Sequence, residues 1–357
     1  MTRALLLSEH DLDAWGRRFD AGEVPSRLPY GVDVLAEEGW QLVGAQGRPG
    51  RVARKVDAVL EHRTGIPVDR TVRGARTARS ADLVLALLER QGVAAARWKR
   101  SGLPPYARTP LVIWSCWLAD DLQRASPETR RRLAGRVAAA DLITHLARGE
   151  TGILVEAGLP EERLFPVTYG VSHRYYRPPD PHEERDIAVL AVGQDRGRDY
   201  RTLVEAVRGT DLRVDIVCKP QNVAGLDVPP NVAVHAPVTL PAYRALLRRA
   251  QVVAVPTVEL AYPTGSSVAL ESASTACCVV VSDTAAMREL FTDRQTARLV
   301  GVGDVEGWRT LLTELRDDAA ERRRLGDAAR RDVEQRHNAD VMWTEIADVL
   351  RRRGIVA

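Results

Sequence analysis

The stretch VVAVPTVELAYPTGSSVALE, which runs from Val252 to Glu271, decides the fold of this chain. Its first residues form a continuous apolar run with the length of a buried strand, and Pro256 ends that strand. Gly265 allows the backbone to approach a ligand closely, and Ser266 or Ser267 can cap the helix that follows. The stretch therefore predicts a strand, loop and helix unit of the kind that builds parallel α/β sheets.

The same stretch predicts a binding site. The start of its helix offers free N–H groups and the positive end of the helix dipole to a phosphate, which makes Thr264, Gly265, Ser266 and Ser267 candidate donor-binding residues. Glu271 lies one turn further along, on the same face as Ser267, where its carboxylate can accept hydrogen bonds from ribose hydroxyls. A capped helix with a glutamate in its first turn is also common without any ligand, and the spacing alone leaves both interpretations open.

Short apolar runs alternate with helical patterns on both sides of this stretch. Strands are expected at 3–8, 41–45, 81–87, 111–115, 142–146 and 165–169, and then at 187–192, 213–218, 232–235, 252–255, 278–282 and 297–300. Helices are expected at 29–38, 127–138, 200–207, 241–250, 267–276, 285–291, 305–317, 319–336 and 338–352. The run 81–87 also fits a helix. Apolar runs without strict alternation are typical of a parallel sheet that is covered on both faces, so the pattern predicts an α/β fold.

One polar segment interrupts this alternation. Residues 177–186 read RPPDPHEERD, contain three prolines and have no periodicity, which indicates an interdomain linker. The length of 357 residues suits two domains. We therefore expect Rossmann-like domains at 1–177 and 187–336, with a final helix in 337–357. In this architecture ligands bind at the carboxyl edges of the sheets.

The composition excludes several classes of protein. The net charge is only +3, which argues against nucleic acid as a partner, because phosphate binding requires an excess of Lys and Arg. The 4 cysteines form no C-x-x-C pair, so we expect a reducing, cytoplasmic location and no metal site. No long apolar window occurs, so membrane contact is expected to be peripheral at most. The GVG at 301–303 has its next glycine misplaced for a dinucleotide fingerprint, and no P-loop, G-x-S-x-G or H-E-x-x-H motif occurs.

Ordered passages between residues 141 and 290 resemble the retaining family 4 glycosyltransferases. They include DLI at 141–143, FPVTYGV at 165–171, YRALLRRA at 243–250, LESA at 270–273 and VVVSD at 279–283. The resemblance implies a GT-B fold, with the first domain binding the acceptor, the second binding the donor and the last helix returning to the first. It implies a retaining, hexosyltransferase-type enzyme that moves a sugar from a nucleoside diphosphate sugar, with UDP favoured over GDP, to a small-molecule or glycan acceptor. No tightly bound cofactor is expected.

The resemblance also assigns residues after the strand 187–192. Gly193 begins the loop, Arg198 stands at the family's lysine and is expected to hold the diphosphate, and Arg196 is the nearest substitute for an arginine that Gln194 replaces. Lys219 follows the strand 213–218 and can reach a phosphate, although an ordinary surface lysine fits equally well. We take Arg198 and Lys219 as catalytic candidates.

One departure from the family pattern concerns the donor sugar. Pro263 occupies the position of the first glutamate in the family's two-glutamate signature. The resemblance makes that glutamate a ligand of the transferred sugar, so the sugar contacts must differ here. Glu259 lies four residues earlier and is the nearest carboxylate in the sequence.

Candidate acceptor residues lie in the first half of the chain. Tyr30 lies at the start of the helix expected at 29–38, and Trp114 and Trp117 lie at the end of a strand, where they can stack on a sugar ring or belong to the core. His10 and His145 lie at strand ends, and His145 is a further catalytic candidate, although a lone histidine is usually structural. Two alternatives to a transferase remain: a GT-B sugar-nucleotide epimerase and a non-catalytic subunit that binds a nucleotide sugar.

Overall fold

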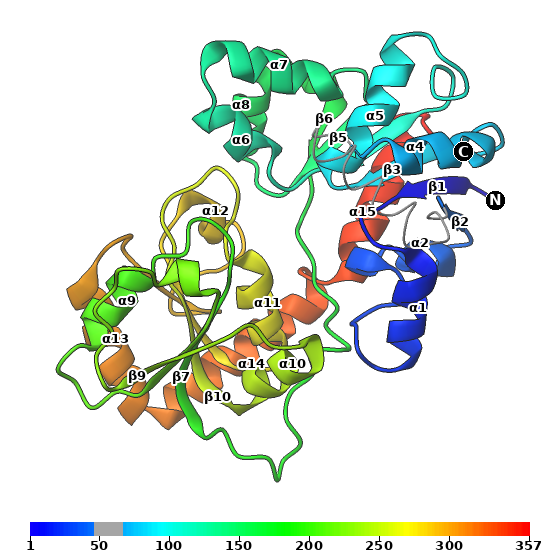
Figure 1. Cartoon of the computed structure of the whole chain (residues 1–357). Helices are drawn as coiled ribbons and strands as arrows, with labels where there is room; N and C mark the ends of the chain where they lie inside the picture. The colour runs from blue at the N-terminus through cyan, green and yellow to red at the C-terminus, as the bar shows by residue number, and fades with distance from the viewer. Residues whose placement is uncertain (46–66) are drawn as a thin grey trace. The chain divides into compact units, whose positions relative to one another are not determined.

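The computed structural model describes residues 1–45 and 67–357 and divides the chain into two compact units (Figure 1). The first unit comprises Met1–Ala21, Ser26–Thr168 and Met342–Ala357. The second comprises Gly22–Pro25 and Tyr169–Val341. The chain therefore leaves the first unit after Thr168 and returns to it at Met342.

The first unit contains a parallel sheet with the strand order β2-β1-β3-β4-β5-β6. Its strands are β1 (Arg3–Leu7), β2 (Gln41–Gly44), β3 (Leu83–Leu87), β4 (Leu111–Trp114), β5 (Leu142–His145) and β6 (Leu164–Pro166). All residues of β3, β4 and β5 are buried, as expected for strands covered on both faces. The run 81–87, which also fitted a helix, is therefore a strand.

Helices connect these strands. They are α1 (Leu12–Asp20), α2 (Val34–Glu37), α4 (Asp69–Ala78), α5 (Glu89–Arg100), α6 (Leu118–Arg124), α7 (Pro127–Val137) and α8 (Glu150–Glu156), with 3₁₀ turns at Pro29–Gly31 and Glu161–Arg163. The helix expected at 29–38 is broken, because Tyr30 has a φ of 62° and Gly31 a φ of 72°. α7 begins as the sequence indicates, with the Ser126 side chain accepting from the Thr129 amide.

The final helix α15 (Ala339–Arg352) packs within the first unit through most of its length. The indole of Trp343 is fully buried and donates to the Tyr30 carbonyl at 2.8 Å. The Glu345 carboxylate accepts from the Thr168 amide at 3.0 Å. The C-terminal helix is thus a part of the first unit's core.

The second unit contains a parallel sheet in the order β12-β11-β10-β7-β8-β9. Its strands are β7 (Ile187–Val192), β8 (Val214–Val217), β9 (Val232–His235), β10 (Ala250–Val255), β11 (Cys278–Ser282) and β12 (Arg298–Val300). Its helices are α9 (Tyr200–Val207), α10 (Leu240–Arg249), α11 (Ser266–Ser274), α12 (Ala285–Arg288), α13 (Val305–Asp317) and α14 (Ala319–Gln335), with a 3₁₀ turn at Pro220–Asn222.

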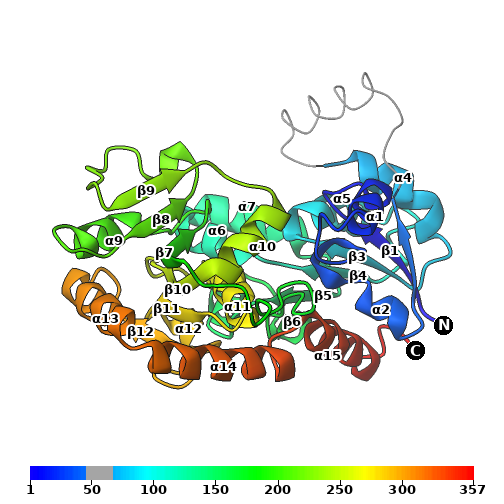
Figure 2. The same ribbon diagram turned by 90° about the horizontal axis from the view of Figure 1, so that it is seen from below.

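Alternate residues of these strands enter two cores. One core joins strand residues such as Ala254 to α9 and α13, and the other joins residues such as Val253 to α10, α11 and α14 (Figures 1 and 2). The chain moves from β7 to β8 on one side and then to β10 on the other side of β7. The order reverses between β7 and β10, and such a switch point is where ligands bind in open α/β sheets.

The proline-rich segment 177–186 lies inside the second unit rather than between the units. Val171 and Tyr176, which precede it, are buried in the second unit's core. Arg185 donates to the carbonyl oxygens of Ala250 at 2.8 Å and Thr275 at 2.6 Å, which ties the segment to the sheet. The composition of the segment is that of a linker, but these tertiary contacts hold it in place.

Candidate functional site

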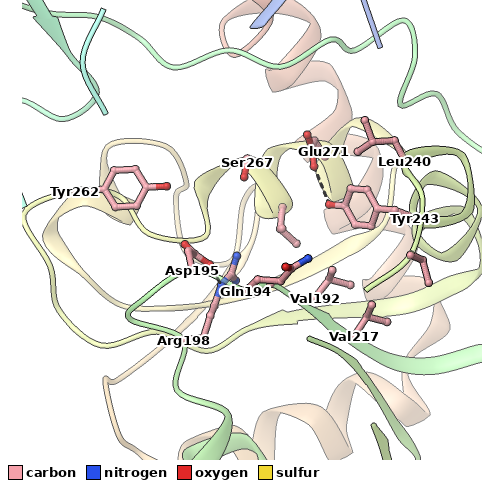
Figure 3. Close-up of a pocket in the computed structure, with 13 residues that line it drawn as sticks. Val192, Gln194, Asp195, Arg198, Val217, Leu240, Tyr243, Tyr262, Ser267 and Glu271 are labelled. Atoms are coloured by element: carbon pink, nitrogen blue, oxygen red, sulfur yellow. Dashed lines mark hydrogen bonds and ion pairs between the residues drawn. The ribbon is translucent and has the colours of Figure 1, made fainter. Parts of the chain in front are cut away.

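A cavity of about 310 Å³ lies at the carboxyl edge of the second unit's sheet (Figure 3). It is formed by the ends of β7 and β8, by α10, by the loop after β10 and by the first turns of α11. Its lining residues are Val192, Gly193, Gln194, Asp195, Arg198, Val217, Val238, Leu240, Tyr243, Tyr262, Ser267, Val268 and Glu271. The cavity therefore combines an apolar floor with two carboxylates and a guanidinium.

Glu271 occupies one end of this cavity. The Tyr243 hydroxyl donates to its Oε2 atom at 2.7 Å (Figure 3), and Tyr176 also interacts with the carboxylate. Burial raises the pKa of Glu271 to about 7, and the two tyrosines and Arg198 act in the opposite direction. A carboxylate held in this way can exchange hydrogen bonds with the hydroxyl groups of a ligand.

The helix that carries Glu271 begins differently from the prediction. Gly265, with a φ of 83°, occupies the N-cap position, and no side chain caps the helix. The prediction that Ser266 or Ser267 caps it is therefore wrong, because both residues already belong to the first helical turn. Ser267 lines the cavity, so the uncapped end of the helix faces the space that a ligand would fill.

Arg198 forms a second part of the cavity wall. Its side chain is only 3% exposed, and its Nε atom donates to Asp195 Oδ1 at 2.6 Å. Its Nη1 atom is buried and has no hydrogen-bond partner among the described residues. A buried N–H group without a partner is costly, so the geometry fits an anionic ligand that would accept from it.

Two glycines make room for this guanidinium. A Cβ atom on Gly193 would lie 2.3 Å from Arg198 Cζ, and one on Gly265 would lie 3.0 Å from Arg198 Nη1. The two glycines have φ angles of 153° and 83°, which side-chain-bearing residues rarely adopt. The loops that carry them also pair directly, because the Asp199 amide donates to the Pro256 carbonyl at 2.9 Å.

Asp195 is a cavity residue that the sequence analysis did not identify. Besides accepting from Arg198, it accepts from the Thr264 hydroxyl through Oδ2 at 2.8 Å. Tyr262 also lines the cavity (Figure 3). Asp195 stands one residue after Gln194 in the loop that the resemblance selects, but only the folded structure shows which of these side chains turns inward.

The predicted donor-binding residues fall into three groups. Those that line the cavity are Gly193, Arg198, Ser267 and Glu271. Those that are buried and outside the lining are Thr264, Gly265 and Ser266. Those that are exposed and outside the lining are Arg196 and Lys219. Glu259, the nearest carboxylate to Pro263 in the sequence, is also exposed and accepts from the Ala285 amide at 3.3 Å.

His145, a predicted catalytic residue, is fully buried at the end of β5 in the first unit. Its Nδ1 atom lies 3.0 Å from the Ala147 carbonyl and its Nε2 atom 3.1 Å from the Thr151 hydroxyl. Burial lowers its pKa to about 4. With both ring nitrogens engaged and no exposed surface, this histidine has the geometry of a structural residue rather than of a base.

Three of the predicted acceptor residues meet in one aromatic cluster of the first unit. The ring centroids of Tyr30 and Trp114 are 4.9 Å apart, and those of His10 and Tyr30 are 6.3 Å apart. Trp114 is 2% exposed and also packs on Trp343, so it belongs to the core and has no face free for stacking. His10 and Tyr30 are half-buried and keep accessible surface.

Trp117 lies apart from this cluster, at the N-cap of α6. Its amide and that of Cys116 donate to the carboxylate of Glu89 at 3.3 and 3.0 Å. Burial raises the pKa of Glu89. Glu89 was missed from the sequence because nothing in its neighbourhood suggests burial, yet it follows Leu88, whose φ of 79° marks a strained turn.

Two further properties bear on the chemistry of the chain. Within residues 1–45 and 67–357, no three His, Cys, Asp or Glu side chains come together in a group able to hold a metal ion. In the same residues, no helix combines the length and the apolar character that crossing a membrane requires.

Residues 196–348 match the family model described as glycosyl transferase-like. The chain is 27% identical over 252 residues to the MMP alpha-(1->4)-mannosyltransferase of Mycolicibacterium hassiacum, and the match covers 67% of this chain. The chain spans only 56% of the length of that relative. The family match thus covers most of the unit that contains the cavity.

Solved structures resemble the chain over its whole length. Anabaena HepE, in complex with UDP and glucose, has a TM-score of 0.70 at 13% identity. The match covers 99% of this chain and 100% of the HepE chain. The sucrose-phosphate synthase of Thermosynechococcus elongatus has a TM-score of 0.71 at 15% identity, with both chains covered completely. These likenesses confirm the predicted GT-B fold. The chain therefore has the GT-B fold, and its residues 196–348 are similar to a family described as glycosyl transferase-like.

Proposed function

We propose that this protein transfers a sugar from a nucleoside diphosphate sugar to an acceptor hydroxyl or amine, with retention at the anomeric carbon. The observation that carries the proposal is that Glu271 and Arg198 line the same cavity. The first supplies a carboxylate for the hydroxyls of a ribose, and the second supplies a buried N–H group without a partner for a phosphate oxygen.

The proposed donor is a UDP-sugar. The solved HepE structures contain UDP or UDP-glucose, and their fold is similar to that of this chain. In our proposal the ribose lies against Glu271, and the diphosphate lies between Arg198 and the uncapped first turn of α11 near Ser267. Donor groups arranged in advance would then stabilise the charge that develops on the leaving diphosphate.

The proposed acceptor site is at the carboxyl edge of the first unit's sheet. His10 and Tyr30 keep accessible surface there, and the Tyr30 hydroxyl donates to Glu9 at 2.8 Å. The strained φ of Tyr30 supports this choice, since such conformations concentrate at functional sites. We do not extend the proposal to His145, whose ring has no exposed surface.

A thermal-shift screen of the full chain against UDP, GDP, ADP and dTDP tests the donor, because a ligand that binds the native state raises the melting temperature. We expect UDP to give the largest shift. Incubation with UDP-sugars and a panel of acceptors should then give a glycoside, and NMR of the new anomeric centre would establish retention or inversion.

Two outcomes would replace the proposal. Conversion of UDP-GlcNAc without any acceptor would identify an epimerase. Binding of nucleotides without turnover of any donor would identify a non-catalytic subunit, for which Pro263 in place of the family's first glutamate is the supporting observation.

A further inference from the structure

Two tyrosines from different parts of the second unit meet at Glu271. Tyr243 lies on α10, and its hydroxyl makes the 2.7 Å hydrogen bond to Glu271 Oε2 (Figure 3). Tyr176 precedes the proline-rich segment, and its ring meets that of Tyr243 edge to face with 6.0 Å between centroids. Both tyrosines are buried. The carboxylate therefore contacts groups that are 28 and 95 residues away in the sequence.

The protein fixes the position of these rings. The Nη1 atom of Arg330 donates to the Tyr176 carbonyl at 3.3 Å and to the Ser274 carbonyl at 2.7 Å. Ser274 ends α11, the helix that carries Glu271. One guanidinium thus joins the backbone of Tyr176 to that helix, so the tyrosine and the carboxylate are held in place relative to each other.

The charge of Glu271 depends on these neighbours. The titratable or charged groups that shift the pKa of Glu271 are Tyr243, Tyr176 and Arg198, whose charge is shared with Asp195, while Tyr175 is a neighbour whose own pKa is raised by Glu271. Burial favours the neutral acid and raises the pKa of Glu271 to about 7, while the hydroxyls of Tyr243 and Tyr176 and the charge of Arg198 favour the carboxylate.

We propose that Tyr243, supported by Tyr176, is a positioning residue that keeps Glu271 ionised and turned toward the cavity. The inference rests on the proposed function, in which Glu271 binds the ribose of the donor. A carboxylate has about four acceptor positions, so the two tyrosines leave room for two ligand hydroxyls. The tyrosines would act only through Glu271 and would make no contact with the reacting atoms.

This arrangement gives nucleotide binding a specific pH dependence. The ionised form of Glu271 accepts from the ribose, so the affinity should rise as the pH increases through about 7. Without the Tyr243 hydroxyl the neutral acid is favoured further, and the rise should move to higher pH. We expect a displacement of about one pH unit, the size that follows from losing a hydrogen bond to a charged group.

The test is calorimetric titration of the full chain with UDP across the range from about pH 5.5 to 9. Tyr243→Phe should bind at least about fivefold more weakly than wild type at neutral pH and should recover at alkaline pH. The matched control is Tyr175→Phe, since the Tyr175 hydroxyl is buried and has no hydrogen-bond partner among the described residues. This control should keep the wild-type profile.

A ligand-independent measurement accompanies the titration. The difference in the pH dependence of unfolding between wild type and Glu271→Gln reports the pKa of Glu271, because folding is linked to its protonation. In Tyr243→Phe the loss of stability with rising pH should extend to higher pH than in wild type. Tyr176→Phe should shift this pH range in the same direction by a smaller amount.

The outcomes separate the two ideas. If Glu271→Gln weakens UDP binding but Tyr243→Phe keeps both wild-type pH profiles, the positioning role is wrong and the proposed function stands. If UDP does not bind wild type, or if Glu271→Gln binds UDP as well as wild type at every pH, the proposed function is wrong in its placement of the ribose.

Discussion

In each unit, an ionisable side chain whose pKa is shifted by burial lies beside the carboxyl edge of the sheet, and the two side chains differ in their surroundings. In the first unit, both ring nitrogens of His145 are engaged by Ala147 and Thr151. In the second unit, Glu271 lines a cavity of about 310 Å³ and keeps acceptor capacity toward it. Both have shifted pKa values. Burial and a shifted pKa therefore do not mark a binding site unless hydrogen-bonding capacity remains directed into a space for a ligand.

The largest expected effect concerns the cavity of the second unit, where Arg198 has a buried N–H group without a partner among the described residues. Arg198→Ala removes the buried N–H group that has no partner, and turnover should fall on the order of 100-fold or more, as it does when one preorganised donor is lost. Binding of the nucleoside monophosphate should change far less, because the distal phosphate is absent. Steady-state kinetics and calorimetry measure the two quantities.

Arg196→Ala is the matched control for Arg198→Ala. Arg196 lies two residues away in the same loop but is exposed and outside the cavity lining, so its loss should be milder. If the two substitutions exchanged their effects, the assignment of the diphosphate contact to Arg198 would be wrong.

The next effect concerns the buried His145 side chain and the free energy of unfolding. The folded pKa of His145 is about 4, below its unfolded value of 6.5, so its contribution to stability is present above 6.5 and is lost as the pH falls through 4. The loss amounts to about 3 kcal/mol at most. Compared with wild type, His145→Gln should show a flatter decline of the unfolding free energy in this range.

Tryptophan fluorescence during urea unfolding is a suitable measure of this difference, since Trp308 is the single tryptophan of the second unit among the chain's 7. At neutral pH His145→Gln should leave nucleotide affinity unchanged. A tenfold loss of turnover in a variant that is folded at the assay temperature would support the predicted catalytic role of His145.

Glu271→Gln should give a smaller effect on binding and the opposite slope in stability. Nucleotide affinity should weaken by at least about 1 kcal/mol, the scale of a hydrogen bond to a charged group. The folded pKa of about 7 lies above the unfolded 4.5, so wild type loses stability as the pH rises through 7. The variant lacks this loss and should unfold later than wild type in alkaline urea titrations; an equal pH slope would contradict the burial of this charge.

The smallest effect is expected from Lys219→Ala. Lys219 is exposed and outside the cavity lining, and exposed charges contribute about 0–1 kcal/mol. UDP affinity should fall less than tenfold in calorimetry, and the difference should disappear at high salt. A loss of UDP affinity of tenfold or more would show that the lysine reaches the diphosphate when ligand is bound.

Local pattern was sufficient to predict the strands. All twelve expected runs are strands, and boundaries differ by only a few residues; the central strands, such as β3 and β4, are buried on both faces and therefore have to be continuously apolar. The linker at 177–186 was read from composition, and composition does not reveal that Arg185 ties this segment to the second unit. Domain limits depend on contacts between distant residues, which no local pattern records.

The same distinction between local pattern and tertiary contacts applies to the residues of the candidate site. Gly193, Arg198, Ser267 and Glu271 lie in two short segments whose residue types were sufficient to indicate a ligand. Only the tertiary structure brought Tyr243 to the second of these segments and turned Asp195 toward Arg198. Which face of a helix or which residue of a loop turns inward is set by packing against elements far away in the sequence, and so is the difference between the enclosed His145 and the accessible Glu271.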